Sequence, residues 1–352
     1  MDNQETSLPK EENKTEPIVF EKYDTKGFFK SMLFGILLGI AIIVPGISGA
    51  AIAIIFKVYD KLLYAVSNIL KKFKTCFMFL LPILLGFAVG FLAGFFAVQK
   101  LLDLIPFAII LNFAGLMIGS YPSVYKEVKG VKKDGKRIAM MAIGFVIPLI
   151  IAGITLFLAR DSVFANPNRL EEVVPEGYYA TQVFGETFAP WLYFAAFPVG
   201  LVLGITQVIP GLSATAFLMM IGWFTALVDT IHFDYLTTHP LILVVLIIML
   251  IGALVGFFIA SKLMTKLFEK NRDLTYHGIV GLSFGSILCL FISQDIFRSG
   301  YVAWYYDIVN TGALTSTHVV DISLGAPLII IGFLLAFFLV KYMDHHEKKQ
   351  EK

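Results

Sequence analysis

Charged residues are scarce in this chain of 352 residues, and long stretches carry none at all. Asp, Glu, Lys and Arg make up 15% of the residues, whereas 57% are hydrophobic, and the mean hydropathy is +0.79. A soluble domain of this length needs a far more polar surface, so the composition excludes that class. It predicts an all-α protein that crosses a membrane several times.

Cysteine and net charge are also in short supply. Cys76 and Cys289 lie in separate apolar stretches without the spacing of a metal site, and the loop and tail histidines show no ligand spacing either. No metal and no cofactor are therefore expected. The net charge of +2 is too small to predict a nucleic-acid partner.

Eight apolar blocks make up most of the chain. They span residues 31–66, 76–99, 105–121, 138–159, 189–228, 241–261, 275–293 and 324–340. A polar loop at 161–188 separates a first half (29–160) from a second half (189–342). Polar tails at 1–28 and 343–352 complete the predicted organisation.

One short phrase occurs twice, 165 residues apart, and each copy lies inside an apolar block. Residues 44–48 are Val-Pro-Gly-Ile-Ser, and residues 209–213 are Ile-Pro-Gly-Leu-Ser. Further residues match between the two copies. At an offset of 165, Gly35 and Gly39 match Gly200 and Gly204. At an offset of 166, Gly86, Gly90 and Lys100 match Gly252, Gly256 and Lys266, and Gly115 and Gly119 match Gly281 and Gly285. The chain is therefore predicted to consist of two related halves.

The positions of Lys and Arg predict which blocks cross the membrane. If all eight crossed, the lysines at 71–74 would share the outside with the basic run at 126–137, contrary to the positive-inside rule. If blocks 31–66 and 189–228 instead enter and turn back, only four of the 28 basic residues remain outside. These four are Lys100, Arg160, Arg169 and Arg298. Both termini then lie in the cytoplasm, and three crossings per half make the second half an inverted copy of the first.

Segment length supports the turn-back in the first half. The arm from Ser31 to Val44 has 14 residues and at ~1.5 Å per residue reaches about 21 Å. That is shorter than the ~30 Å hydrocarbon core of a bilayer. The uncharged run at 187–228 is long enough for either a re-entrant pair or a full hairpin, and both remain open.

The two Pro-Gly breaks predict an anion site. Proline suits the first position of a returning helix, the N–H groups that follow have no partner within that helix, and glycine allows close approach. Two such tips that meet at mid-membrane would form a pocket rich in donors and poor in cations, suited to a phosphate group. The predicted headgroup-binding residues are Pro45, Gly46, Ile47, Ser48, Gly49, Gln207, Pro210, Gly211, Leu212, Ser213 and Thr215.

Two competing interpretations accompany these features. A single Pro-Gly-x-Ser usually marks a kinked, glycine-packed membrane helix, whereas duplication at matching positions favours binding. Lys57, just past the first break, and the equivalent pair Lys100 and Lys266 fit anchors at the membrane interface, and they also fit access sites for an anionic headgroup.

These residues resemble a family of bacterial membrane proteins associated with translocation of undecaprenyl phosphate and related polyprenyl phosphates. Residues 39–60 are similar to its glycine-rich approach, Val-Pro-Gly-x-Ser-Gly motif and Tyr-acid pair, and residues 209–224 resemble the partner copy. Ile42, Ala214 and Thr225 depart from the pattern, where an acid, a glycine and an acid are expected. The resemblance implies that a polyprenyl phosphate lipid is returned from the outer to the inner leaflet for reuse in envelope synthesis.

Two other functions would use similar features. A transporter of a small soluble anion such as phosphate or sulfate needs the same donors. An undecaprenyl-diphosphate phosphatase also pairs re-entrant segments, but its chemistry requires acid-base or charge-neutralising side chains. No Asp, Glu, His, Lys or Arg lies between Ser31 and Phe56, so the sequence favours a transporter over an enzyme. A coupling ion, H+ or Na+, and the oligomeric state are left open.

Overall fold

The computed structural model describes residues 24–46, 71–132, 134–158, 183–185, 189–230 and 233–350, with scattered positions between 52 and 69. The named elements in these ranges are all helical. In chain order they are α1 (Thr25–Ile43), α4 (Phe73–Leu104), α5 (Pro106–Tyr125), η1 (Lys126–Val128), α6 (Gly135–Leu158), α9 (Pro190–Val208), α10 (Ala214–Met220), α11 (Phe224–Asp229), α12 (Phe233–Thr238), α13 (Ile242–Leu290), α14 (Gln294–Ile296), η3 (Phe297–Val302), α15 (Ala303–Thr311) and α16 (Ser316–Gln350). Among the described residues, eight stretches are long and apolar enough to cross a membrane, which confirms the predicted all-α polytopic fold.

The first helix is longer than the sequence predicted. Asp24 caps α1, because its carboxylate accepts a hydrogen bond from the N–H of Gly27 at 2.7 Å. With 19 residues α1 is about 28 Å long, close to the ~30 Å thickness of a hydrocarbon core. A helix of this length is compatible both with a full crossing and with a re-entrant segment.

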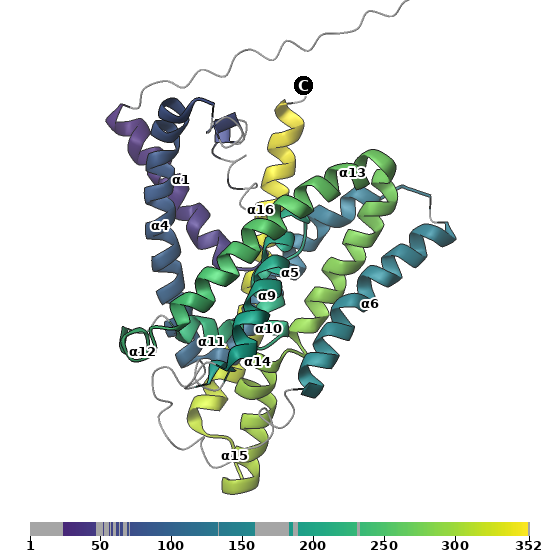
Figure 1. The fold of residues 1–352 in the computed structure, drawn as a ribbon. Coiled ribbons are helices and arrows are strands. Elements are labelled where there is room, and N and C mark those ends of the chain that lie inside the picture. The colour runs from purple at the N-terminus through teal and green to yellow at the C-terminus, as the bar shows by residue number, and fades with distance from the viewer. Residues whose placement is uncertain are drawn as a thin grey trace, which may run out of the picture.

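Helices α1 and α4 lie side by side and run in the same direction (Figure 1). Glycines form their contact, since a Cβ on Gly35 would lie 2.2 Å from the carbonyl oxygen of Ile83, and one on Gly39 would lie 2.3 Å from that of Phe87. Residue numbers increase together along both helices. The start of α4 therefore lies beside the start of α1 rather than beside its end.

The second half repeats this pair. A Cβ on Gly200 would lie 2.0 Å from the carbonyl oxygen of Met249, and one on Gly204 would lie 1.9 Å from that of Ala253. Both glycines follow their first-half counterparts by 165 residues, and both contacted carbonyls follow theirs by 166. α9 and the first part of α13 are thus also parallel neighbours, and the start of α13 lies beside the start of α9.

The remaining four spans pair across the two halves. α5 packs on α16, where a Cβ on Gly115 would lie 2.1 Å from the carbonyl oxygen of Ile329. α6 packs on the second part of α13, where a Cβ on Gly281 would lie 2.0 Å from the carbonyl oxygen of Met141. Each half therefore contributes one helix to each of these pairs, and the two halves interlock.

A kink at Asn271 divides α13 into two parts. The first contains the apolar stretch Ile242–Met264, and the second makes up most of the stretch Lys266–Ile296, which continues into α14. Asn271 has non-helical φ and ψ of −162° and 85°. Its side-chain oxygen accepts a hydrogen bond from the N–H of Leu274 at 3.0 Å and so caps the second part. The chain reverses direction at this point (Figure 1).

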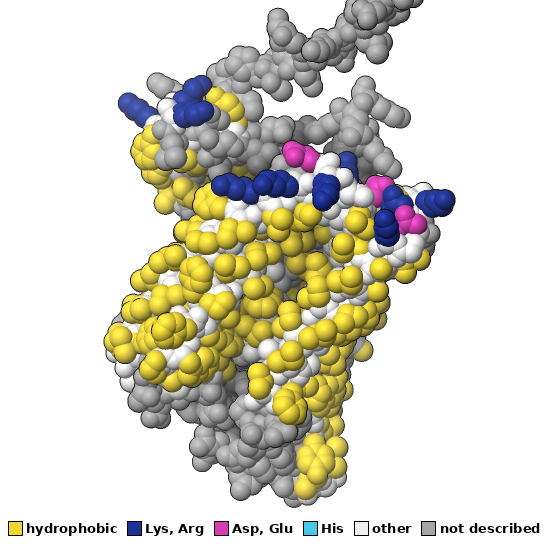
Figure 2. All heavy atoms as spheres, turned by 45° about the vertical axis from the view of Figure 1, so that its right-hand side comes forward, with side chains coloured by type: hydrophobic (Ala, Val, Ile, Leu, Met, Phe, Trp, Pro, Cys, Tyr) yellow, Lys and Arg dark blue, Asp and Glu magenta, His cyan; other side chains and the backbone are white. Residues whose placement is uncertain are grey.

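Basic side chains gather at the end of the molecule where α6 begins and α13 bends, above a wide apolar belt (Figure 2). Arg137 contacts Asp134 at 2.9 Å and Asp273 at 3.3 Å, and Arg272 contacts Glu127 at 3.0 Å. The backbone N–H and the charge of Arg137 lower the pKa of Asp134. These contacts tie the segment before α6 to the bend of α13.

The opposite end carries α12, α14 and α15 (Figure 1). Asp307 of α15 contacts His318 near the start of α16. Asp321, which is only 1% exposed, accepts hydrogen bonds from the N–H groups of residues 107 and 108 at 3.1 and 2.8 Å. This carboxylate of α16 therefore caps the start of α5.

Candidate functional site at the two helix breaks

Both copies of the repeated phrase interrupt a helix in the same way. α1 ends at Ile43 and α9 ends at Val208. Gly46 and Gly211 follow with φ of +85° and +79°, a left-handed conformation that glycine adopts with little strain. The matching cap bonds run from the N–H of Val44 to the carbonyl of Ile40 and from the N–H of Ile209 to the carbonyl of Ile205, at 3.3 Å each.

The first break rests against α5 of its own half, and the second rests against α13 of its own half and α5 of the other half. A Cβ on Gly46 would lie 2.7 Å from the carbonyl oxygen of Leu116 in α5. A Cβ on Gly211 would lie 2.4 Å from Oγ of Ser283 in α13 and 2.6 Å from Cγ2 of Val124 in α5. Only a residue without a side chain fits these approaches, so the two glycines determine how closely the breaks seat.

A hydrogen bond joins the two breaks. Oγ1 of Thr215, just after the second break, donates to the carbonyl oxygen of Ile43, just before the first, at 2.8 Å. Thr215 is 4% exposed and Ile43 is 6% exposed. The bond therefore lies in the interior, between segments 172 positions apart in the sequence.

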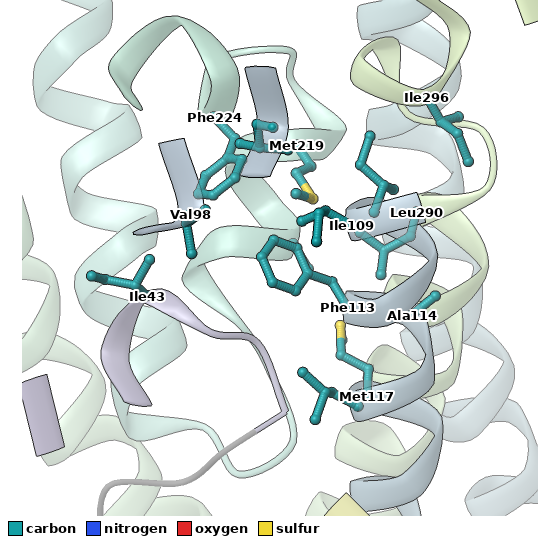
Figure 3. Close-up of a cluster of buried hydrophobic side chains, with 14 of the residues drawn as sticks. Ile43, Val98, Ile109, Phe113, Ala114, Met117, Met219, Phe224, Leu290 and Ile296 are labelled. Carbon is teal, nitrogen blue, oxygen red and sulfur yellow. The ribbon is translucent and has the colours of Figure 1, made fainter. Parts of the chain in front are cut away.

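Apolar side chains fill the interior on one side of this bond. Figure 3 shows Ile43 at the end of α1, with side chains of α5, α10, α11, α13 and α14 converging nearby. Phe113, Met219, Phe224 and Leu290 are each at most 5% exposed. The cluster continues to Ile296 of α14 and so holds the segment after the second break against both halves.

The second break presents several hydrogen-bond donors. Within the part of the chain that the structure describes, no partner is assigned to the backbone N–H groups of Gly211, Ser213, Ala214 and Thr215. The hydroxyl oxygen of Ser213 accepts from the N–H of Ala216 at 3.2 Å, which leaves the hydroxyl proton able to donate outward. Leu212 differs, because its N–H donates to the carbonyl of Ile209 at 3.3 Å.

The predicted headgroup residues differ in exposure. At the first break Pro45 is buried and Gly46 is half-buried, whereas Ile47, Ser48, Gly49 and Lys57 lie outside the described residues. At the second break Gln207, Pro210 and Gly211 are exposed, Leu212 and Ser213 are half-buried, and Thr215 is buried with its hydroxyl proton already donated. The groups at the second break that can reach a ligand are therefore mainly backbone amides and the Ser213 hydroxyl.

The two equivalent lysines are both exposed. Lys100 is exposed near the end of α4, and Lys266 is exposed on α13 close to its bend at Asn271. Because α4 starts at the basic end and α13 bends there, Lys100 lies on the part of α4 away from the basic end, and Lys266 lies close to that end (Figure 1).

Two polar residues near the breaks did not stand out in the sequence. Ser283, 2% exposed, faces Gly211 and donates to the carbonyl of its own helix at Ile279. Gln99, 6% exposed, donates from Nε2 to the carbonyl oxygen of Val228 at 3.1 Å and so links α4 to α11. A polar side chain within an apolar span is the signal that marks both residues.

Comparison with known proteins identifies the family of this chain. Residues 38–300, which include both breaks, match the family described as undecaprenyl phosphate translocase-like. A polyprenyl-phosphate transporter from Staphylococcus aureus is 25% identical over 282 residues, which cover 79% of this chain and 90% of that protein. A polyprenyl-phosphate transporter from Vibrio cholerae is 23% identical over 277 residues, which cover 75% of this chain and 77% of that protein. No solved structure matches the chain. With eight apolar helical stretches and a match across both of its halves, the chain is a multi-pass protein of a bacterial cell membrane and belongs to the undecaprenyl phosphate translocase-like family.

Proposed function

We propose that this protein carries a polyprenyl phosphate, such as undecaprenyl phosphate, from the outer to the inner leaflet of the membrane. The family and the names of the two relatives support the lipid class. The observation that carries the proposal is the hydrogen bond between Thr215 and Ile43, because it brings two donor-bearing helix breaks to one place.

The proposed topology has two inverted halves. Segments 31–66 and 189–228 enter and leave on the same side, and six further segments cross. The parallel packing of α1 with α4 and of α9 with α13 supports this arrangement, since each parallel pair needs a returning connection. The basic end then faces the cytoplasm together with both termini.

The breaks are suited to the headgroup for an electrostatic reason. A phosphate monoester carries about −1.5 to −2 charges near neutral pH, and its burial without hydrogen bonds is costly. The amides of Gly211, Ser213, Ala214 and Thr215, which have no partner assigned among the described residues, and the Ser213 hydroxyl would replace part of its hydration shell. Gly46 and Ser48 would supply the equivalent groups from the first half. No lysine or arginine lies at either Pro-Gly phrase. The headgroup would therefore be held without an ion pair and could leave again. Rocking of one half against the other would expose it to each side in turn, while the polyprenyl tail stays in lipid.

A soluble anion such as phosphate is the competing substrate, because it would use the same donors. Purified protein in liposomes, with undecaprenyl phosphate labelled in one leaflet, separates these functions. We expect leaflet exchange of the lipid that an excess of inorganic phosphate does not abolish. Uptake of phosphate without lipid exchange would overturn the proposal.

Ser213→Ala tests the site in the same liposomes. Loss of one hydrogen bond to a charged group costs about 1.5 kcal/mol, or roughly tenfold in lipid exchange. Ser323→Ala is the matched control, because Ser323 is exposed on α16 and its hydroxyl donates to the carbonyl of Val319 in the same helix. Equal rates for the two variants would remove Ser213 from the site.

Lys100→Ala and Lys266→Ala distinguish the two interpretations of the lysines. If these residues give the headgroup access to the site, the lipid concentration for half-maximal exchange rises while the maximal rate is kept. If they are interfacial anchors, neither quantity changes.

A further inference from the structure

The hydrogen bond between the two breaks has no equivalent in the first half, although the helix pairs around it are alike in both halves. The glycine contacts of α1 with α4 recur in α9 with α13 at matching positions. At the offset of 165, however, the counterpart of Thr215 is Ala50, and the counterpart of Ile43 is Val208. Alanine has no side-chain donor, so the first half cannot form the equivalent bond.

The bond satisfies an acceptor that would otherwise be costly. The Ile43 carbonyl is among the last four of α1 and has no partner within that helix. An unsatisfied carbonyl in a membrane interior costs free energy, and Thr215 relieves this at the first break. The equivalent carbonyl of Val208 receives no hydrogen bond from any side chain that the structure describes.

We propose that Thr215 is a positioning residue that holds the transporter in the observed one of its two alternating states. This inference rests on the proposed function, because in an inverted-repeat transporter the two halves exchange conformations to reach the second state. In that state position 50 would take the place of position 215, and the bond to Ile43 would be lost without replacement. Typical membrane hydrogen bonds make this a bias of about threefold to tenfold.

The assignment changes the role expected for Thr215 from the sequence. Its hydroxyl proton is donated to Ile43 and is not available to a headgroup. Its hydroxyl therefore acts on the equilibrium between states, and the neighbouring amides and Ser213 act on the headgroup.

Alkylation of an introduced cysteine measures this equilibrium without lipid. Ala216→Cys places the reporter on α10, where the side chain is 1% exposed within the apolar cluster. Protein without the reporter corrects for Cys76 and Cys289, which are both buried. We expect Thr215→Val to raise the alkylation rate by about threefold to tenfold, and Thr215→Ser, which keeps the hydroxyl, to leave it near that of the parent.

Ala50→Thr separates a shift between states from local loosening. This variant keeps Thr215 and its bond, yet it adds a donor that favours the opposite state, so alkylation should again become faster. A residue with only a structural role at 215 would not produce this result. An unchanged rate in Thr215→Val, or an unchanged or slower rate in Ala50→Thr, would overturn the inference. Because the assay contains no lipid, these outcomes leave the proposed function standing, whereas absence of lipid exchange by the unmodified protein would count against the function instead.

Discussion

Substitution of Gly211 by alanine tests how tightly the second break is seated. The new Cβ would lie 2.4 Å from Oγ of Ser283 and 2.6 Å from Cγ2 of Val124, and φ at this position is +79°. The left-handed conformation costs an L-residue roughly 1–2 kcal/mol. Overpacking adds about 1–3 kcal/mol. We therefore expect Gly211→Ala to lower the free energy of unfolding by roughly 2–5 kcal/mol.

Two further variants separate these terms. Gly312→Ala is the matched control, because Gly312 has φ of +74°, yet a Cβ added there would meet no atom of the described residues within 4 Å, so the change should cost only about 1 kcal/mol. Ser283→Ala removes the 2.4 Å contact. Combined with Gly211→Ala, it should recover about 1 kcal/mol relative to the sum of the single changes.

Equilibrium unfolding in mixed micelles with increasing SDS measures each of these free energies. Strict additivity of Gly211→Ala and Ser283→Ala would refute the seating of the break on α13. Equal losses for Gly211→Ala and Gly312→Ala would show that the backbone conformation alone matters. Gly46→Ala should resist rescue by any side-chain truncation, because its closest contact is the backbone of Leu116 in α5.

Three further predictions concern buried polar contacts. Asp321→Ala leaves the N–H groups of residues 107 and 108 without their acceptor and should cost about 2 kcal/mol in the same unfolding assay, whereas Asp321→Asn should recover part of this. Gln99→Leu breaks the bond to Val228 and should speed hydrogen exchange in α11 while exchange in α16 stays unchanged. Burial alone would raise the pKa of Asp307, but hydrogen bonds from Thr315 and His318 hold it below its ordinary value of 3.8. The stabilising contribution of the Asp307 carboxylate is therefore present above pH 3.8 and is lost as the pH falls through the lower, folded-state pKa. Hydrogen exchange in α15 should become faster in strong acid. Asp307→Asn should abolish this dependence of exchange on pH.

The sequence predicted the membrane class and the position of both breaks because these depend on local composition. Apolar blocks partition into lipid whatever their neighbours are, and Pro-Gly interrupts a helix through its own backbone. The boundaries were less accurate. The cap at Asp24 extends α1 beyond its apolar block, so an argument from the length of that block did not decide whether the segment crosses.

The partner of each residue across the two halves was not predictable in the same way. The sequence marked Thr215 as a headgroup donor, yet its hydroxyl is bonded to Ile43, and Ser283 became relevant only because Gly211 rests on it. Such contacts depend on how two folded surfaces meet, which a pattern along one segment does not encode.

The amino-acid sequence alone thus determined that this is a helical membrane protein with matching Pro-Gly breaks, and it predicted two related halves. Only the tertiary structure decided that α1 and α4 run parallel, that α5 pairs with α16 across the halves, and that one hydroxyl joins the two breaks. The physical reason is that transfer into lipid and helix breaking act within each segment, whereas the pairing of glycine surfaces and the sharing of an unsatisfied carbonyl arise between segments that are distant in the sequence.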